Sequence, residues 1–95
     1  MKNQDLYVNL KMQIKKEKLA IIAGEGDLVL SSIKACKNQN ISFFLVGIKE
    51  FYNNTAFLPD ACLSLNNIGN IFSILYKEKI KYLIFIGKVN KPSLL

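Results

Sequence analysis

The sequence contains no histidine and no arginine, and it contains only two cysteines. Without histidine the chain cannot supply a histidine general base or a nucleophile activated by one. A zinc site would need ligands beyond two isolated cysteines. Cys36 and Cys62 each lie in an apolar stretch, which predicts that both thiols are buried.

Long hydrophobic runs are also missing. No apolar stretch approaches the roughly 20 residues that cross a membrane. The polar first residues are not followed by the apolar run of a signal peptide. The cytoplasm is therefore the expected location, with at most peripheral membrane contact.

Every basic residue is a lysine, and the formal net charge is +6. This balance favours anionic partners such as nucleotides, phosphates or acidic lipid headgroups, unless the lysines simply form a solvated surface. No RNA-binding signature and no zinc-finger spacing is present, so nucleic acid is not an expected partner.

The 95 residues are 51% hydrophobic and 21% charged, which indicates one folded domain rather than a disordered chain.

Short apolar runs that end at glycine are typical of buried strands, and segments with apolar residues at helical spacing separate them. The Asp27 side chain is expected to cap the first helix, whose apolar face would hold Leu28, Leu30, Ile33, Ala35 and Cys36. We expect strands at 18–23, 41–48, 61–65 and 82–86, helices at 27–40 and 67–79, and a loop or short helical turn at 49–59.

Residues 1–17 are mainly polar, with Leu6, Leu10 and Ile14 at four-residue spacing. This stretch is either a short amphipathic helix or a leader without fixed structure. Residues 18–95 form the expected domain.

Strands that alternate with helices predict an α/β fold: a small Rossmann-like three-layer domain with a mainly parallel sheet of three or four strands. The strand at 82–86 is apolar throughout and requires neighbours on both sides. No further strand follows it, so either an uncovered sheet edge or a missing layer is expected, and a homodimer is one consequence of an uncovered edge.

Ligands of open α/β sheets bind at the carboxyl ends of the strands. Three segments are expected there: 24–27, Gly47 with Lys49 and Glu50, and 87–92. Glycines at 24 and 26 permit close approach of a phosphate to the start of a helix, and Lys88 and Lys91 could supply charge to a diphosphate. The alternative is that the two glycines only form a tight turn. A dinucleotide fingerprint is not present, because Val29 stands where its third glycine belongs.

Three blocks of this chain resemble the N-terminal half of the UDP-2,3-diacylglucosamine pyrophosphatase family of lipid A synthesis. Residues 19–28 are similar to an apolar strand followed by Ala-Gly-Gly-Gly-x-Leu-Pro, and residues 65–71 to Leu-Gly-Gln-Leu-Gly-Lys. Residues 85–94 are similar to Ala-Gly-Lys-Val-x-Arg-Pro-x-Leu. The chain departs from these blocks at Glu25, Val29, Asn66, Asn67 and Lys91. The substrate-binding residues that the resemblance and the strand ends indicate are Gly24, Glu25, Gly26, Asp27, Gly69, Gly87, Lys88 and Lys91.

The resemblance implies a two-domain cytoplasmic hydrolase that converts UDP-2,3-diacylglucosamine to UMP and 2,3-diacylglucosamine 1-phosphate. It implies a divalent metal such as Mg²⁺ for the whole enzyme and none held by this chain. The essential acidic residues of the family lie in its C-terminal domain, so this chain would be a substrate-binding half, incomplete and inactive alone. Its expected partners are a UDP-diacylglucosamine-type substrate and a separately encoded C-terminal domain. The alternative is a non-catalytic remnant or a nucleotide-binding module of the same fold.

Overall fold

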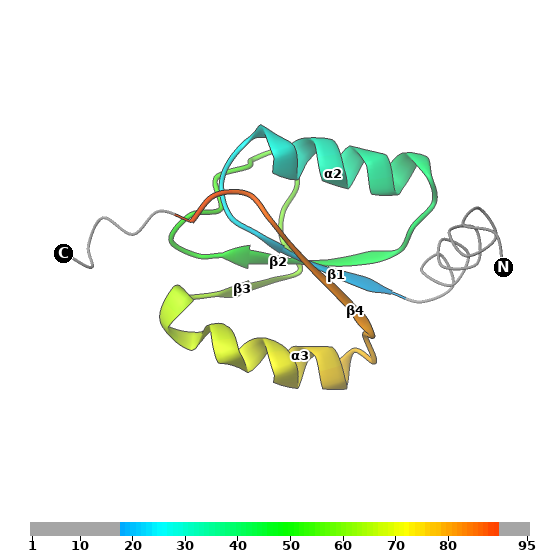
Figure 1. Ribbon diagram of the computed structural model, residues 1–95. Helices are drawn as coiled ribbons and strands as arrows, with labels where there is room; N and C mark the ends of the chain where they lie inside the picture. The colour runs from blue at the N-terminus through cyan, green and yellow to red at the C-terminus, as the bar shows by residue number, and fades with distance from the viewer. Residues whose placement is uncertain (1–17, 90–95) are drawn as a thin grey trace, which may run out of the picture.

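The computed structural model describes residues 18–89, which form three layers with one helix on each face of a central sheet (Figure 1). The predicted leader at 1–17 and the predicted ligand residue Lys91 lie outside the described residues. The elements in chain order are β1 (Leu19–Ala23), α2 (Asp27–Asn38), β2 (Phe43–Ile48), β3 (Ala61–Leu63), the 3₁₀ helix η1 (Leu65–Asn70), α3 (Ile71–Lys77) and β4 (Tyr82–Ile86).

The four strands are all parallel and lie in the order β3-β2-β1-β4. In the central strand, Ile21 is in register with Leu45 of β2 and with Ile84 of β4. The connection from β1 to β2 runs through α2, and the connection from β3 to β4 runs through η1 and α3. The predicted small Rossmann-like α/β fold with a parallel sheet is confirmed.

Each face of the sheet has its own hydrophobic core. On one face, Ile21 and Leu45 of the sheet pack with Val29, Ile33 and Cys36 of α2. On the other face, Ile22, Val46 and Ile48 pack with Ile71 of α3. Because β1 has a helix above and below it, all five of its residues are buried, as a continuous apolar run predicts.

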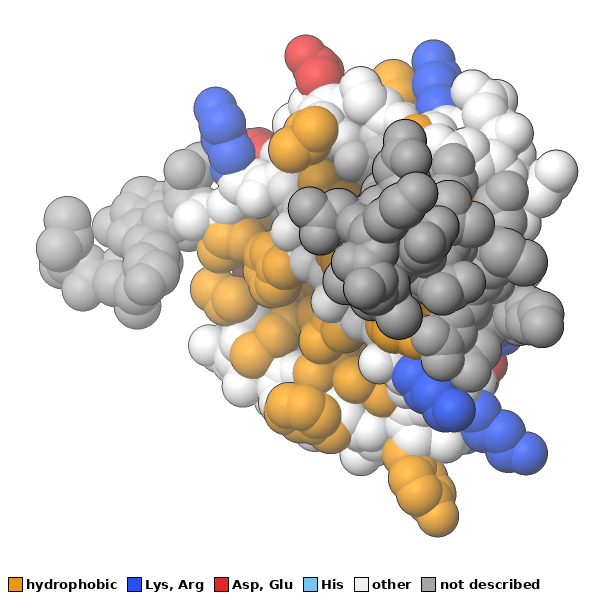
Figure 2. All heavy atoms as spheres, turned by 45° about the vertical axis from the view of Figure 1, so that its right-hand side comes forward, with side chains coloured by type: hydrophobic (Ala, Val, Ile, Leu, Met, Phe, Trp, Pro, Cys, Tyr) orange, Lys and Arg blue, Asp and Glu red, His pale blue; other side chains and the backbone are white. Residues whose placement is uncertain are grey.

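The strand β4 lies at an edge of the sheet, and β1 is the one strand beside it among residues 18–89. Its three central residues, Leu83, Ile84 and Phe85, are 41%, 40% and 53% exposed. Phe72 and Tyr76 of α3 are also exposed, and Figure 2 shows hydrophobic side chains gathered on one side of the molecule. Among residues 18–89, β4 is therefore an edge strand.

Several local predictions are wrong. Asp27 does not cap α2: Gly26 is the N-cap residue, no side chain caps the helix, and Asp27 is its first helical residue. Ile33 and Cys36 of the predicted apolar face are buried, but Leu28 and Ala35 are exposed, and Val29 completes the buried stripe instead. Cys62 is exposed because β3 is an edge strand that presents this position to solvent.

The predicted helix at 67–79 begins as a 3₁₀ helix and becomes α-helical only at Ile71, because Asn67 has non-helical backbone angles. Within the part of the chain that the structure describes, no helix is both long enough and apolar enough to cross a membrane.

Candidate functional site

The turns after β1 and β4 lie side by side at the carboxyl edge of the sheet. The N–H of Gly24 donates to the carbonyl oxygen of Ile86 at 2.9 Å. One residue further on, Glu25 and Lys88 exchange two main-chain hydrogen bonds of 3.1 and 2.8 Å as an isolated antiparallel bridge. The structure therefore brings segment 24–27 and Gly87–Lys88 together, as the rule for parallel strands predicts.

Two of the glycines are required by this close approach of backbones. A Cβ on Gly24 would lie 2.3 Å from the carbonyl oxygen of Lys88. Gly87 has a φ of +99°, and a Cβ there would lie 2.9 Å from the carbonyl oxygen of Glu25. The tight-turn interpretation therefore accounts for these two glycines without any ligand.

Gly26 differs from its neighbours, because a Cβ at this position would meet nothing within 4 Å. Its φ of +121° turns the chain from β1 into α2, and this residue is exposed. No side chain caps the first turn of α2, where Asp27 is also exposed. An anion that binds at the start of a helix needs open space and main-chain N–H groups that no side chain caps. This turn offers both.

A hollow of about 280 Å³ lies beside this turn. Its lining residues come from the β1–α2 turn, the first turn of α2 and the loop after β2: Gly26, Asp27, Leu30, Asn53, Asn54 and Thr55. The Oδ1 of Asn54 accepts a hydrogen bond of 2.8 Å from the N–H of Ala56, which fixes this amide locally. Amide and hydroxyl groups of this kind can bind ribose or base edges, whereas the sequence predicts only a loop or short helical turn at 49–59.

The segment after β2 is held by a carboxylate. Glu50 accepts hydrogen bonds from the hydroxyl of Ser64 and from the N–H of Leu65, the latter at 2.8 Å. These bonds, the Ser64 hydroxyl first, hold the pKa of the Glu50 carboxyl below its ordinary value. Gly47 lies under Tyr52, with 3.1 Å between a Cβ built on it and the nearest ring atom, so this glycine serves packing.

Gly69 does not lie with the turns after β1 and β4, whereas Lys88 does. Gly69 lies in η1, which packs through Ile68 on the α3 face of the sheet, and it does not line the hollow beside Gly26. Lys88 is exposed next to the Glu25 bridge.

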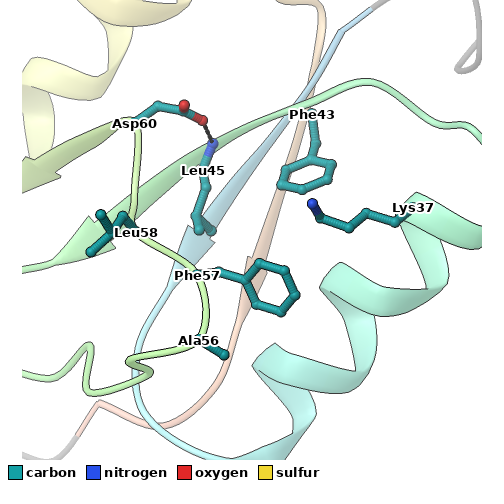
Figure 3. Close-up of a pocket in the computed structure, with 7 residues that line it drawn as sticks. All are labelled: Lys37, Phe43, Leu45, Ala56, Phe57, Leu58 and Asp60. Carbon is teal, nitrogen blue, oxygen red and sulfur yellow. Dashed lines mark hydrogen bonds between the residues drawn. The ribbon is translucent and has the colours of Figure 1, made fainter.

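A larger pocket of about 440 Å³ lies elsewhere, between the last turn of α2 and the loop that precedes β3 (Figure 3). Lys37, Phe43, Phe57 and Asp60 are among its lining residues. The amine of Lys37 is 5.0 Å from the centre of the Phe57 ring, and the two side chains point toward each other. A carboxylate oxygen of Asp60 accepts a hydrogen bond of 2.7 Å from the N–H of Leu45. No sequence motif joins these residues, so sequence reasoning could not identify this pocket.

The residues that could bind Mg²⁺ near the carboxyl edge are Glu25 and Asp27. Across residues 18–89, no three His, Cys, Asp or Glu side chains lie close enough together to hold a metal ion. Two carboxylates do not make a complete site. The described residues therefore do not fit a resident metal.

Comparison with known proteins gives one family. Residues 18–95 match the model described as the LpxI N-terminal domain. No curated protein matches the chain. The match begins where the described fold begins and includes every residue of the candidate site.

Proposed function

Because the chain belongs to the family of the LpxI N-terminal domain, a family of lipid A biosynthesis, we propose that it is the substrate-binding part of a UDP-2,3-diacylglucosamine pyrophosphatase. The reaction would release UMP and 2,3-diacylglucosamine 1-phosphate. The three resembling blocks in the sequence and the family match support the proposal.

The observation that carries the proposal is the meeting of segment 24–27 with Gly87–Lys88 beside the uncapped start of α2. The main-chain N–H groups of the first turn of α2 would bind the diphosphate. Lys88 is within the same group of turns and would supply positive charge, as a point charge rather than a bidentate fork. The polar hollow at Asn53–Thr55 would accept the ribose or uracil.

Catalysis is proposed to require a second, C-terminal domain. The candidate site holds the carboxylates of Glu25 and Asp27, and no histidine is available anywhere in the chain. A site of this composition can bind and orient substrate, but among residues 18–89 its carboxylates are not joined by the further ligands with which a metal ion would activate water. Gly69 and Lys91 remain predicted contacts of the substrate or of the second domain.

A non-catalytic nucleotide-binding module is the second candidate. One observation favours it: Asp27 is the one ionisable residue that lines the hollow, and a carboxylate there weakens binding of a diphosphate. Such a module would bind a nucleotide with fewer phosphates, or none, more tightly than UDP.

Thermal unfolding with UDP, UMP, uridine or inorganic phosphate tests the proposal. A ligand present at ten times its dissociation constant stabilises the native state by about 1.4 kcal/mol, which raises the melting temperature of a domain of this size by several degrees. UDP should give the largest shift. Lys88→Ala should reduce the shift, and Lys34→Ala, which removes an exposed lysine from α2, should leave it unchanged. Equal shifts for uridine and UDP would favour the non-catalytic module, and no shift at millimolar UDP would contradict nucleotide binding altogether.

A further inference from the structure

The side-chain amide of Asn54 has a fixed orientation. Its Oδ1 accepts a hydrogen bond of 2.8 Å from the N–H of Ala56, two residues further along the loop after β2. The opposite orientation would place the NH₂ group of Asn54 against that N–H, donor against donor. The oxygen is therefore occupied. Nδ2, which makes no hydrogen bond within residues 18–89, is the group that Asn54 offers to a ligand.

The hollow that Asn54 lines has two sides. The turn into α2 forms one side through Gly26 and Asp27, and the loop after β2 forms the other through Asn53, Asn54 and Thr55. A nucleotide whose phosphates bind at the start of α2 therefore has its base on the side of the loop. Leu30, which is half-buried, offers an apolar surface to the flat face of a base.

The other polar groups of the hollow do not select one base over another. The amide of Asn53 and the hydroxyl of Thr55 can each donate or accept, and both residues are exposed and free to turn. The carboxylate of Asp27 only accepts, but it lies on the side of α2, where the hydroxyl groups of the ribose are its nearest donors. A fixed donor on the side of the loop comes from Asn54.

On the basis of the nucleotide site proposed above, we propose that Asn54 is the residue that selects uracil over cytosine. Its Nδ2 donates to the carbonyl oxygen that uracil carries where cytosine carries an amino group. With cytosine in the same position two donors would face each other, and neither would have a partner. Ribose and phosphates are identical in UDP and CDP, so this contact decides between them. UDP should bind about tenfold more tightly than CDP.

Titration of the isotope-labelled full chain with UDP and with CDP tests the proposal, because amide shifts give a dissociation constant for each nucleotide. Asn54→Asp keeps an oxygen for the N–H of Ala56 and turns the free donor into an acceptor. In this variant the preference should reverse, with CDP binding more tightly than UDP. Asn53→Asp is the matched control, since it adds the same charge to the same hollow. It should weaken both nucleotides alike and leave their ratio unchanged.

The side-chain NH₂ signals of Asn54 supply an independent readout. In the wild type they should shift more at saturation with UDP than at saturation with CDP. Circular dichroism verifies that each variant is folded. The ratio of the two dissociation constants, measured on one sample, does not depend on how much of that sample is active.

Two results would overturn the selection of uracil by Asn54 and leave the nucleotide site in place. One is equal binding of UDP and CDP, or tighter binding of CDP, by the wild type. The other is an unchanged preference for UDP in Asn54→Asp. If neither nucleotide binds at millimolar concentration, the proposed function itself is wrong, and the role of Asn54 falls with it.

Discussion

Glu25 and Lys88 are joined main chain to main chain: each N–H donates to the carbonyl oxygen of the other, at 3.1 and 2.8 Å. This bridge holds the turn after β1 against the turn after β4. The geometry of the candidate site therefore depends on backbone contacts that a side chain at the neighbouring glycines would disrupt.

Gly24→Ala should destabilise the fold by about 2 kcal/mol, because the new methyl group must displace the carbonyl of Lys88 from a distance of 2.3 Å. Urea unfolding monitored by circular dichroism measures the loss. Gly69→Ala is the matched control, since a Cβ there meets nothing within 4 Å and should change the free energy of unfolding by less than about 0.5 kcal/mol. Equal effects of the two substitutions would contradict the contact with Lys88.

Glu50→Gln should lower stability at neutral pH and have little effect in acid. The folded-state pKa of Glu50 lies below its ordinary value of 4.5, because the carboxylate accepts hydrogen bonds from Ser64 and Leu65. A lowered carboxyl pKa contributes stability that is fully present above 4.5 and is lost as the pH falls through the folded-state value. Urea midpoints of the wild type and the variant should therefore differ at pH 7 and converge at acidic pH.

Ser64 provides the control for that experiment. Ser64→Ala removes the hydroxyl that donates to Glu50. The two substitutions act on one interaction, so the double variant should lose less stability than the two single losses added together. Strict additivity would show that the Glu50–Ser64 hydrogen bond does not contribute.

Asp60→Ala should cost about 1–2 kcal/mol, because it leaves the buried N–H of Leu45 without its acceptor. Asp60→Asn keeps an acceptor oxygen at the same place and should lose less than half as much. Thermal or urea unfolding of the two variants measures the difference. Equal losses would indicate that charge, and not the hydrogen bond to Leu45, explains the effect.

The two cysteines should react at very different rates with a thiol reagent at about pH 8. Cys62 is exposed, whereas Cys36 is buried beneath α2 and burial raises the pKa of its thiol, which lowers the fraction of reactive thiolate. The native protein should therefore show one fast thiol, and the second should react only on unfolding. Cys62→Ser should remove the fast phase. A fast phase that persists in this variant would show that Cys36 is accessible.

The sequence was sufficient to predict most of the fold because the strands are marked by composition. β1, β2 and β4 are apolar runs that end at or near glycine, and burial of both faces of β1 follows from that pattern. The errors occur where tertiary contacts decide. The predicted helix at 67–79 begins instead as part of a 3₁₀ helix, Leu65–Asn70, in which Asn67 has non-helical backbone angles. The exposure of Cys62 depends on the place of β3 at the edge of the sheet.

The candidate site was predicted only in outline. Parallel strands bring their carboxyl ends to one edge, which is why segment 24–27 and Gly87–Lys88 could be expected together. The contact of Gly24 with Lys88 could not be expected, since it depends on how far the two turns approach. The contribution of Asn53–Thr55 to the hollow beside Gly26 could not be predicted either. It depends on the tertiary fold, which places the loop after β2 beside the first turn of α2.

Chemical-shift mapping with UDP tests the central claim most directly. In an isotope-labelled sample, UDP should shift the amides of Gly26, Asp27 and Leu28 together with those of Asn53–Thr55 and Lys88. The amides of Asn40 and Lys81, at the opposite edge of the sheet, should not move. Shifts confined to the pocket around Lys37 and Phe57, or no shifts at millimolar UDP, would contradict a nucleotide site at the carboxyl edge.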